Sequence, residues 1–171
     1  VAEFTWQNYD TPLKFEDLIV SKEEFMDRGY FKEEKSLIYK SGTSFNRFVV
    51  SKLLKPHSNS NWLIDLAAGR GADMFRVSKA NIKNALFMDI DVHALSELVS
   101  RKHDFQRGVK RLNTKIYTKA MDLTTDHKVV VESIKKIGVP IGLINVIMCN
   151  FAIHYIIRTP AYVKNIISLI K

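Results

Sequence analysis

The sequence predicts an α/β fold, mainly a parallel sheet with helices on both faces. Short apolar stretches alternate four times with segments of helical periodicity between residue 62 and the end of the chain. In such alternation each strand is followed by a helix that returns the chain to the same sheet, so the strands run parallel. At 171 residues, with 46% hydrophobic and 26% charged residues, the chain resembles one ordinary globular domain.

Before the first predicted strand, residues 1–43 are expected to be an N-terminal extension or linker, with one short helix at Ser21–Arg28. The polar stretch KSGTS suggests a break, and its last residue, Ser44, is a suitable N-cap. From there the apolar residues keep helical spacing until Pro56, which cannot continue a helix. The predicted domain therefore comprises residues 44–171.

Four strands and the helices between them follow. The expected strands are Trp62–Leu66, Ala85–Ile90, Lys115–Met121 and Leu143–Phe151. The expected helices are one that ends near Lys79, one that begins at the N-cap Asp91, one marked by apolar residues from Val129 to Ile137, and one that begins at Thr159-Pro160. Ligands of such sheets bind beyond the carboxyl ends of the strands, near the switch in strand order. The residues that follow each strand are therefore the candidates for a site.

The chain is basic, with 26 Lys and Arg residues against 18 Asp and Glu residues, a formal net charge of +8 and a pI near 9.5. Basic domains attract polyanions, so nucleic acid enters as a class of partner. The single cysteine, Cys149, excludes an internal disulfide and favours a reduced, cytosolic or nuclear protein. No apolar stretch reaches the ~20 residues of a membrane helix. The start at Val1 rather than Met, and the stop at Lys171 within a helical pattern, favour a fragment of a longer protein.

The turn after the first strand, LIDLAAGRGAD, combines an acid with two glycines. Gly69 and Gly71 allow the backbone to turn sharply and to lie against a ligand. Asp65 lies inside the strand, four residues before the first glycine. A carboxylate there suits a cationic ligand group better than a pyrophosphate. The alternative is an ordinary tight turn between a strand and a helix.

Two further acids end the next two strands. Asp89, twenty residues beyond Gly69, is placed to accept both hydroxyls of a ribose. Asp122 is placed to accept from the exocyclic amine of an adenine. The alternatives are an N-cap role for Asp89, which Asp91 fills better, and an ordinary strand end for Asp122.

The fourth strand ends in CNFAIHY, which contains Asn150, His154 and Tyr155. The pattern D-x-A-x-G-x-G at the first strand is similar to motif I of S-adenosylmethionine-dependent methyltransferases. Together, DLAAGRGAD, MDID, MDL and NFAIHY are similar to the messenger-RNA cap guanine-N7 methyltransferases, in which the fourth strand ends F-x-x-H-Y. The helix FNRFVVSKLL also resembles the family's F-N-N-W-x-K-x-x-L segment, so the resemblance covers residues 44–171.

The resemblance implies a Rossmann-like class I fold, with S-adenosyl-L-methionine as the cofactor. The family fold continues with three further strands that carry an acid and an aromatic of the guanine pocket, and these are expected to be missing from this chain. The implied donor-binding residues are Asp65, Gly69, Gly71, Asp89, Asp122 and Asn150, the last at a position where the family usually has Gln. The family's lysine falls on Val50, and Lys52, two residues on, is the candidate to replace it.

The resemblance also implies the residues that contact the cap. His154 and Tyr155 would contact the guanine, Arg76 and Arg101 the phosphates, Arg70 matches a further basic position, and Asn46 falls on the first asparagine of F-N-N. Guanine N7 has a lone pair and no proton to lose, so no residue is expected to act as a general acid or base, and catalysis would rest on positioning. The other histidines lack metal-ligand spacing, so no metal is expected.

The opening segment, VAEFTWQNYDTPLKFEDLI, resembles the connectors that follow the guanylyltransferase module in multifunctional capping enzymes of large cytoplasmic DNA viruses. The implied reaction is transfer of a methyl group from S-adenosylmethionine to N7 of the GpppN cap of RNA. Guanylyltransferase and triphosphatase modules in the same parent chain are the implied partners. The expected location is cytoplasmic for a viral protein and nuclear for a cellular one. The alternatives are a methyltransferase acting on another RNA site or on a small molecule, and a non-catalytic methyltransferase-like partner module.

Overall fold

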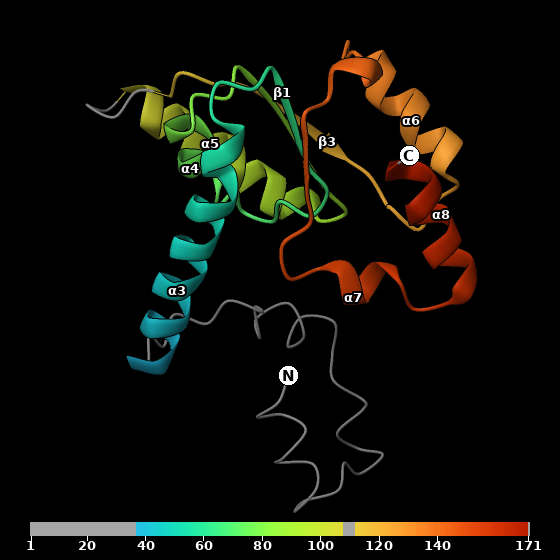
Figure 1. Cartoon of the computed structure of the whole chain (residues 1–171), viewed down its shortest axis with the longest axis horizontal. Helices are drawn as coiled ribbons and strands as arrows, with labels where there is room; N and C mark the ends of the chain where they lie inside the picture. Colours follow the sequence, from blue (N-terminus) through green and yellow to red (C-terminus); the bar gives the residue numbers. More distant parts are fainter. Residues whose placement is uncertain (1–36, 108–111, 171) are drawn as a thin grey trace, which may run out of the picture. The chain divides into compact units, whose positions relative to one another are not determined.

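The computed structural model describes residues 37–107 and 112–170 (Figure 1). Contacts divide the chain into two units, Val1–Gly42 and Thr43–Lys171, and the fold described here is that of the second. The helix expected at Ser21–Arg28 lies outside the described residues.

A parallel four-stranded sheet forms the centre of this unit. Its strands are β1 (Trp62–Asp65), β2 (Asn84–Asp89), β3 (Lys115–Ala120) and β4 (Val146–Met148), in the order β3-β2-β1-β4. The chain moves outward from β1 to β3 and then returns to add β4 on the other side of β1. The switch in strand order thus falls between β1 and β4, and ligands of open α/β sheets bind at such a point. The predicted parallel α/β fold is confirmed.

Helices cover both faces of the sheet, and each face has its own core. On one face α3 (Leu37–Leu54), α4 (Met74–Lys79) and α5 (Val92–Arg107) pack on Leu63 and Phe87. On the other face α6 (His127–Lys136), α7 (Ile153–Ile156) and α8 (Pro160–Ile170) pack on Ile64 and Met88. Figure 1 shows α4 and α5 on the opposite side of the sheet from α6 and α8. Neighbouring residues of one strand point to opposite faces, which is why a strand buried on both sides is an unbroken apolar run.

Two of the predicted N-caps are confirmed by their hydrogen bonds. The Asp91 carboxylate accepts from the backbone N–H groups of His93 at 2.8 Å and Ala94 at 3.1 Å, at the start of α5. The Thr159 hydroxyl accepts from the backbone N–H of Tyr162 at 3.2 Å, at the start of α8. Each cap satisfies a backbone donor that a helix leaves without an internal partner.

The predicted start of the first helix at Ser44 is wrong, because α3 already begins at Leu37. Gly, Ser and Thr lower helix propensity by up to ~1 kcal/mol each, but unlike proline they keep the backbone N–H that the helix needs. The KSGTS stretch therefore does not break the helix. At the other end the prediction is close to the structure: α3 ends at Leu54, and Pro56 lies in a short 3-10 helix, Lys55–His57.

The fourth strand is shorter than the predicted Leu143–Phe151. It begins after a 3-10 turn at Ile141–Leu143 and comprises only Val146–Met148. Just before it, the Asn145 side-chain oxygen accepts from the backbone N–H groups of Asn61 at 2.9 Å and Trp62 at 3.1 Å. The chain leaves the sheet after Met148, and Phe151, three residues on, has a φ of +59° in the left-handed region. The predicted strand is too long because the apolar sequence continues beyond the three residues that pair with β1.

Candidate active site

Asp65 is the last residue of β1 and is almost fully buried, with 3% of its surface exposed. Its Oδ1 accepts from the backbone N–H of Ala67 at 3.3 Å, and no ion pair joins it to another described residue. Burial is the main cause that raises the pKa of Asp65 to about 7. The Ala67 hydrogen bond opposes this rise, and the negative charges of Asp73 and Asp89 contribute to it. A buried carboxyl without a cationic partner is a suitable contact for a cationic ligand group.

The turn that follows β1 is shaped by its two glycines. Gly69 and Gly71 have φ values of +49° and +70°, which L-residues that carry a Cβ atom adopt only at a cost in conformational energy. A Cβ atom on Gly71 would lie 2.6 Å from Cγ of Leu98, whereas a Cβ on Gly69 would meet nothing within 4 Å. Gly71 therefore lets α5 approach the turn, and Gly69 leaves open space beside the backbone.

Asp89 connects the end of β2 to this turn. Its Oδ2 accepts from the backbone N–H of Gly69 at 2.7 Å, and its Oδ1 accepts from that of Asp91 at 2.9 Å. Each carboxylate oxygen has a second lone pair, so Asp89 retains capacity to accept from ligand hydroxyls. The structure thus brings Asp65, Gly69 and Asp89 together at the carboxyl ends of two adjacent strands.

Asp73 is a member of the site that we did not select from the sequence, although it ends the LAAGRGAD turn. Its Oδ1 accepts from Nη1 of Arg76 at 2.9 Å, and its Oδ2 accepts from Nδ2 of Asn150 at 2.9 Å. The second bond links the turn after β1 to the residues after β4. Two signals were available: Asp73 is the final residue of the DLAAGRGAD motif that carries the family resemblance, and its Asp-x-x-Arg spacing to Arg76 within one helical turn is typical of a local ion pair.

The three predicted cap-binding arginines all lie near this turn, and each has a partner. Nη1 of Arg76 also donates to the backbone oxygen of Ala72 at 2.7 Å, and its side chain is only 16% exposed. Nε of Arg70 lies 3.1 Å from Oε2 of Glu97. Nη1 of Arg101, on α5, donates to the backbone oxygen of Arg70 at 2.8 Å. Arg70 and Arg101 are the more accessible of the three.

His154 and Tyr155 lie next to each other in α7, a four-residue helix that follows β4. Their ring centroids are 3.9 Å apart and both side chains are exposed. Cζ of Arg158 lies 5.7 Å from the Tyr155 ring centroid, within the range of a cation–π contact. Arg158 is a second residue that the sequence did not single out, because it lies beyond the resemblance motif. The group is an exposed aromatic and cationic surface at the end of β4.

The remaining predicted residues are Asp122, Lys52 and Asn46, and within the described part of the chain none of them bonds to Asp65 or Asp89. Asp122 follows β3, is exposed, and accepts from the hydroxyl of Thr124 at 2.7 Å and its backbone N–H at 2.8 Å, which lower the pKa of Asp122. Lys52 lies on α3 with Nζ 5.3 Å from the Phe48 ring centroid. Asn46, also on α3, is half-buried. Val50, where the family has its lysine, is buried in the core.

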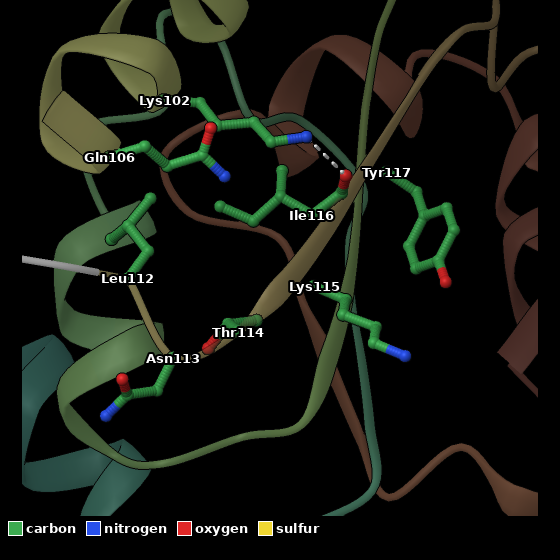
Figure 2. A pocket seen from close by; sticks show the side chains of 8 residues that line it. All are labelled: Lys102, Gln106, Leu112, Asn113, Thr114, Lys115, Ile116 and Tyr117. Carbon is green, nitrogen blue, oxygen red and sulfur yellow. Dashed lines mark hydrogen bonds between the residues drawn. The ribbon is translucent and has the colours of Figure 1, made fainter.

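A pocket of about 370 Å³ lies at the other end of the sheet (Figure 2). It is formed by the start of β3 and the last turns of α5, where Nζ of Lys102 donates to the backbone oxygen of Ile116 at 3.1 Å. Figure 2 shows Lys102, Gln106 and Leu112 on one side of β3 and Tyr117 on the other. The pocket therefore lies at the amino end of β3, whereas the predicted donor residues follow the carboxyl ends of strands.

Neither a metal cluster nor a membrane helix is found among residues 37–107 and 112–170. No group of three or more His, Cys, Asp or Glu side chains gathers there to hold a metal ion. None of the helices in these ranges is both long enough and apolar enough to cross a bilayer.

Comparison with known proteins identifies the family. A model of the mRNA (guanine-N(7))-methyltransferase domain matches residues 19–170. The chain belongs to this family. The match covers the sheet, the LAAGRGAD turn and α7, so the family that the motifs resemble is confirmed.

Relatives of this family member occur among viral capping enzymes. The chain is 33% identical, over 98% of its length, to the mRNA-capping enzymes of African swine fever virus isolates Pig/Kenya/KEN-50/1950 and Warthog/Namibia/Wart80/1980. It spans 19% of the length of these relatives.

Solved structures show the same fold. Magnesium protoporphyrin IX methyltransferase from Synechocystis, crystallised with bound SAM, superposes with a TM-score of 0.55 at 15% identity, over 87% of this chain and 66% of that one. The structure of the same enzyme with bound SAH superposes with a TM-score of 0.51, over 86% of this chain and 62% of that one. The chain thus has the class I methyltransferase fold, and at this identity the likeness concerns the fold alone.

Proposed function

We propose that this chain transfers a methyl group from S-adenosylmethionine to N7 of the guanine cap of RNA. The observation that carries the proposal is the pair of carboxylates, Asp65 and Asp89, beside Gly69 at the switch in strand order of a chain that belongs to this family. The donor carries a sulfonium, an ammonium and a ribose, and it has no phosphate. A site built from acids rather than cations suits such a ligand.

The residues fit the donor in their chemistry. Asp65 offers a buried carboxyl to the ammonium, and the positive charge of the ligand would compensate the burial that raises its pKa. Asp89 offers two oxygens to the ribose hydroxyls while it holds Gly69 in place. Asn150 offers its side-chain oxygen. Asp122 remains the candidate for the exocyclic amine of the adenine, and Lys52 remains the candidate for the donor contact of the family's lysine.

When bound, S-adenosylmethionine supplies an electrophilic methyl group on its sulfonium. The protein then has to hold the guanine so that N7, the methyl carbon and the sulfur lie in line, an effect worth up to ~7–11 kcal/mol. His154 would donate to guanine O6, and the Tyr155 ring would stack on or hydrogen-bond to the base. No proton has to leave N7, so this arrangement of residues needs no general base.

The cap phosphates and the RNA chain are assigned to cationic side chains. Arg70 and Arg101 lie at the turn after β1, and Arg158 lies beside Tyr155. Arg76 is held by Asp73 in this structure and would have to exchange that partner to reach a phosphate. Asn46 on α3 is a further candidate. A net charge of +8 supports a polyanionic substrate.

The sequence relatives support two further parts of the proposal. This chain spans 19% of the length of the viral capping enzymes, which supports further modules in one parent chain, and guanylyltransferase and triphosphatase are the activities that we propose for them. A cytoplasmic location, in a viral factory or virion, follows if the parent is viral.

Titration calorimetry with S-adenosylmethionine, followed by methyl transfer to capped RNA, uncapped RNA and free GTP, tests the proposal. We expect donor binding, and transfer to capped RNA but not to uncapped RNA. Failure of the chain to bind the donor would reject every methyltransferase function. Transfer to internal RNA sites but not to the cap would favour a methyltransferase of another specificity.

A further inference from the structure

Asp73 occupies the N-cap position of α4 but does not cap the helix. Its backbone φ is −97° and ψ is −5°, and its side chain accepts no hydrogen bond from a backbone N–H group of the first turn. Aspartate at an N-cap normally accepts from the backbone N–H groups of the second or third helical residue. Here the carboxylate is turned toward other partners, so its contribution to the structure lies elsewhere.

Both oxygens of Asp73 are used, and they join two parts of the site. Oδ1 accepts from Arg76 on the same turn, and Oδ2 accepts from Nδ2 of Asn150, which is 77 positions later in the sequence. The side chain of Asp73 is 18% exposed, so the bonds are only partly open to water. Charge-assisted hydrogen bonds in such surroundings are stronger than those on an open surface.

The bond from Asn150 to Asp73 decides which end of the amide is left for a ligand. Nδ2 donates to Asp73, and within residues 37–107 and 112–170 no group donates to Oδ1 of Asn150. The amide therefore retains an acceptor. An acceptor suits the ammonium and hydroxyl groups of S-adenosylmethionine, whereas an NH2 group would suit neither as well.

We propose that Asp73 is a positioning residue for the methyl donor: it holds the Asn150 amide so that the carbonyl oxygen, not the NH2 group, is presented to the ligand. The inference rests on the proposed function. It also connects the turn after β1 to the segment that leads into α7, so the two halves of the site share one hydrogen-bonded side chain.

Electrostatics supply a second signature of this role. The titratable groups that act on Asp65 are the carboxylates of Asp73 and Asp89, with Arg76 opposing the charge of Asp73. Asp65 in turn helps to raise the pKa of the neighbouring Cys149 thiol, after the larger effect of burial. The negative charge of Asp73 helps to keep the Asp65 carboxyl protonated. Removing that charge lowers the pKa of Asp65, so the pH at which the donor begins to bind moves to a lower value.

The test is calorimetry with S-adenosylmethionine between pH 5.5 and 8.5, on the whole chain and on four variants. These are Asp73→Asn, Asp73→Ser, Asn150→Asp and the exchanged pair Asp73→Asn/Asn150→Asp. Serine is a good N-cap, so Asp73→Ser keeps or improves the start of α4 while removing the bridge. Thermal unfolding of each variant separates a loss of binding from a loss of fold.

We expect Asp73→Asn and Asp73→Ser to weaken donor binding about tenfold at pH 8 and to move its pH midpoint downward. Asn150→Asp places two carboxylates against each other and weakens binding further. The exchanged pair restores one donor and one acceptor, so it recovers affinity relative to Asn150→Asp.

Three outcomes decide between the ideas. If the wild-type chain binds no donor, the proposed function fails and this inference fails with it. If the wild type binds but both Asp73 variants keep its affinity and pH midpoint, only this inference is overturned. An exchanged pair that binds no better than Asn150→Asp overturns it as well.

Discussion

The turn after β1 and the segment after β4 lie at the same edge of the sheet but are built differently. In the turn, the backbone N–H groups of Leu66 and Ala68 donate to Met148 and Met88 of the neighbouring strands, each at 2.9 Å, and Gly71 is buried. After β4, the side chains of Phe151, Ile153, Tyr155 and Ile157 are 69%, 42%, 41% and 40% exposed, and only Ile156 is buried.

This difference separates the two halves of the proposed site. The turn after β1, which carries the donor residues Asp65, Gly69 and Gly71, is part of the folded core, so substitutions there alter stability and donor binding together. The half assigned to guanine is carried by a four-residue helix with little burial, so its substitutions should alter transfer alone. The following variants test that separation.

Asp89→Ala should have the largest effect. It removes two charge-assisted contacts to the ribose and the bond that holds Gly69, so donor affinity should fall about thousandfold, roughly 4 kcal/mol. Calorimetry with S-adenosylmethionine measures it. Asp91→Ala is the matched control: it removes the cap of α5, costs about 1 kcal/mol of unfolding free energy and retains donor affinity. Equal losses of affinity in the two variants would contradict the role of Asp89.

Gly71→Ala should destabilise the fold by about 3 kcal/mol, because it adds strain at a positive φ to a Cβ placed 2.6 Å from Leu98. Gly69→Ala has the strain without the clash and should cost about 1 kcal/mol. Urea denaturation of the pair gives the two free energies of unfolding. If the two variants were equally stable, the close packing of α5 against this turn would be refuted.

His154→Ala should lower the rate of transfer to capped RNA about a hundredfold, the size of effect that misplacing a reactant produces. Donor affinity and the free energy of unfolding should stay at their wild-type values, because His154 is exposed on α7. Single-turnover transfer measures the rate. His103→Ala, an exposed histidine of α5, serves as the control. Full activity of His154→Ala on capped RNA would remove this residue from the guanine site.

Asp65 should make the fold less stable as pH rises toward 7. The folded chain keeps the Asp65 proton up to a pKa of about 7, while the unfolded chain releases it near the ordinary value of 3.8. The stabilisation is complete below the ordinary value and is lost by about pH 7. Asp65→Asn cannot titrate, so between pH 5 and pH 8 it should gain on the order of 2 kcal/mol relative to wild type. The free energies of unfolding of both proteins are measured by urea denaturation at each pH. If the two free energies changed in parallel with pH, the pKa of Asp65 in the folded chain would be the ordinary one.

Much of the turn and its acids could be predicted from the sequence. Strands buried on both faces produce continuous apolar runs, and parallel strands bring their carboxyl ends to one edge, so Asp65 and Asp89 could be placed together from their spacing alone. Glycines that need positive φ are equally visible. The role of Asp73 was not visible, because the contact with Asn150 depends on how two distant turns meet.

The ends of elements were less predictable. The largely apolar run Leu143–Phe151 predicts a long strand, yet pairing stops at Met148, and α7 follows within a stretch that has no cap signal. The start of α3 differs for the opposite reason, since the weak helix formers of KSGTS predict a break where the helix in fact continues. In each case local preference was small beside the tertiary contacts that decide where an element ends.

Asn145 gives β4 a fixed starting point, and the consequence reaches the far end of the strand. Three paired residues alone hold a strand weakly, and a shift of one position exchanges the two faces. By accepting from the N–H groups of Asn61 and Trp62, Asn145 fixes the register of β4 against β1. This register also fixes the position of Asn150, five residues later. The Asn145 side chain, at the amino end of β4, thus determines which residue forms the hydrogen bond with Asp73 at the other end.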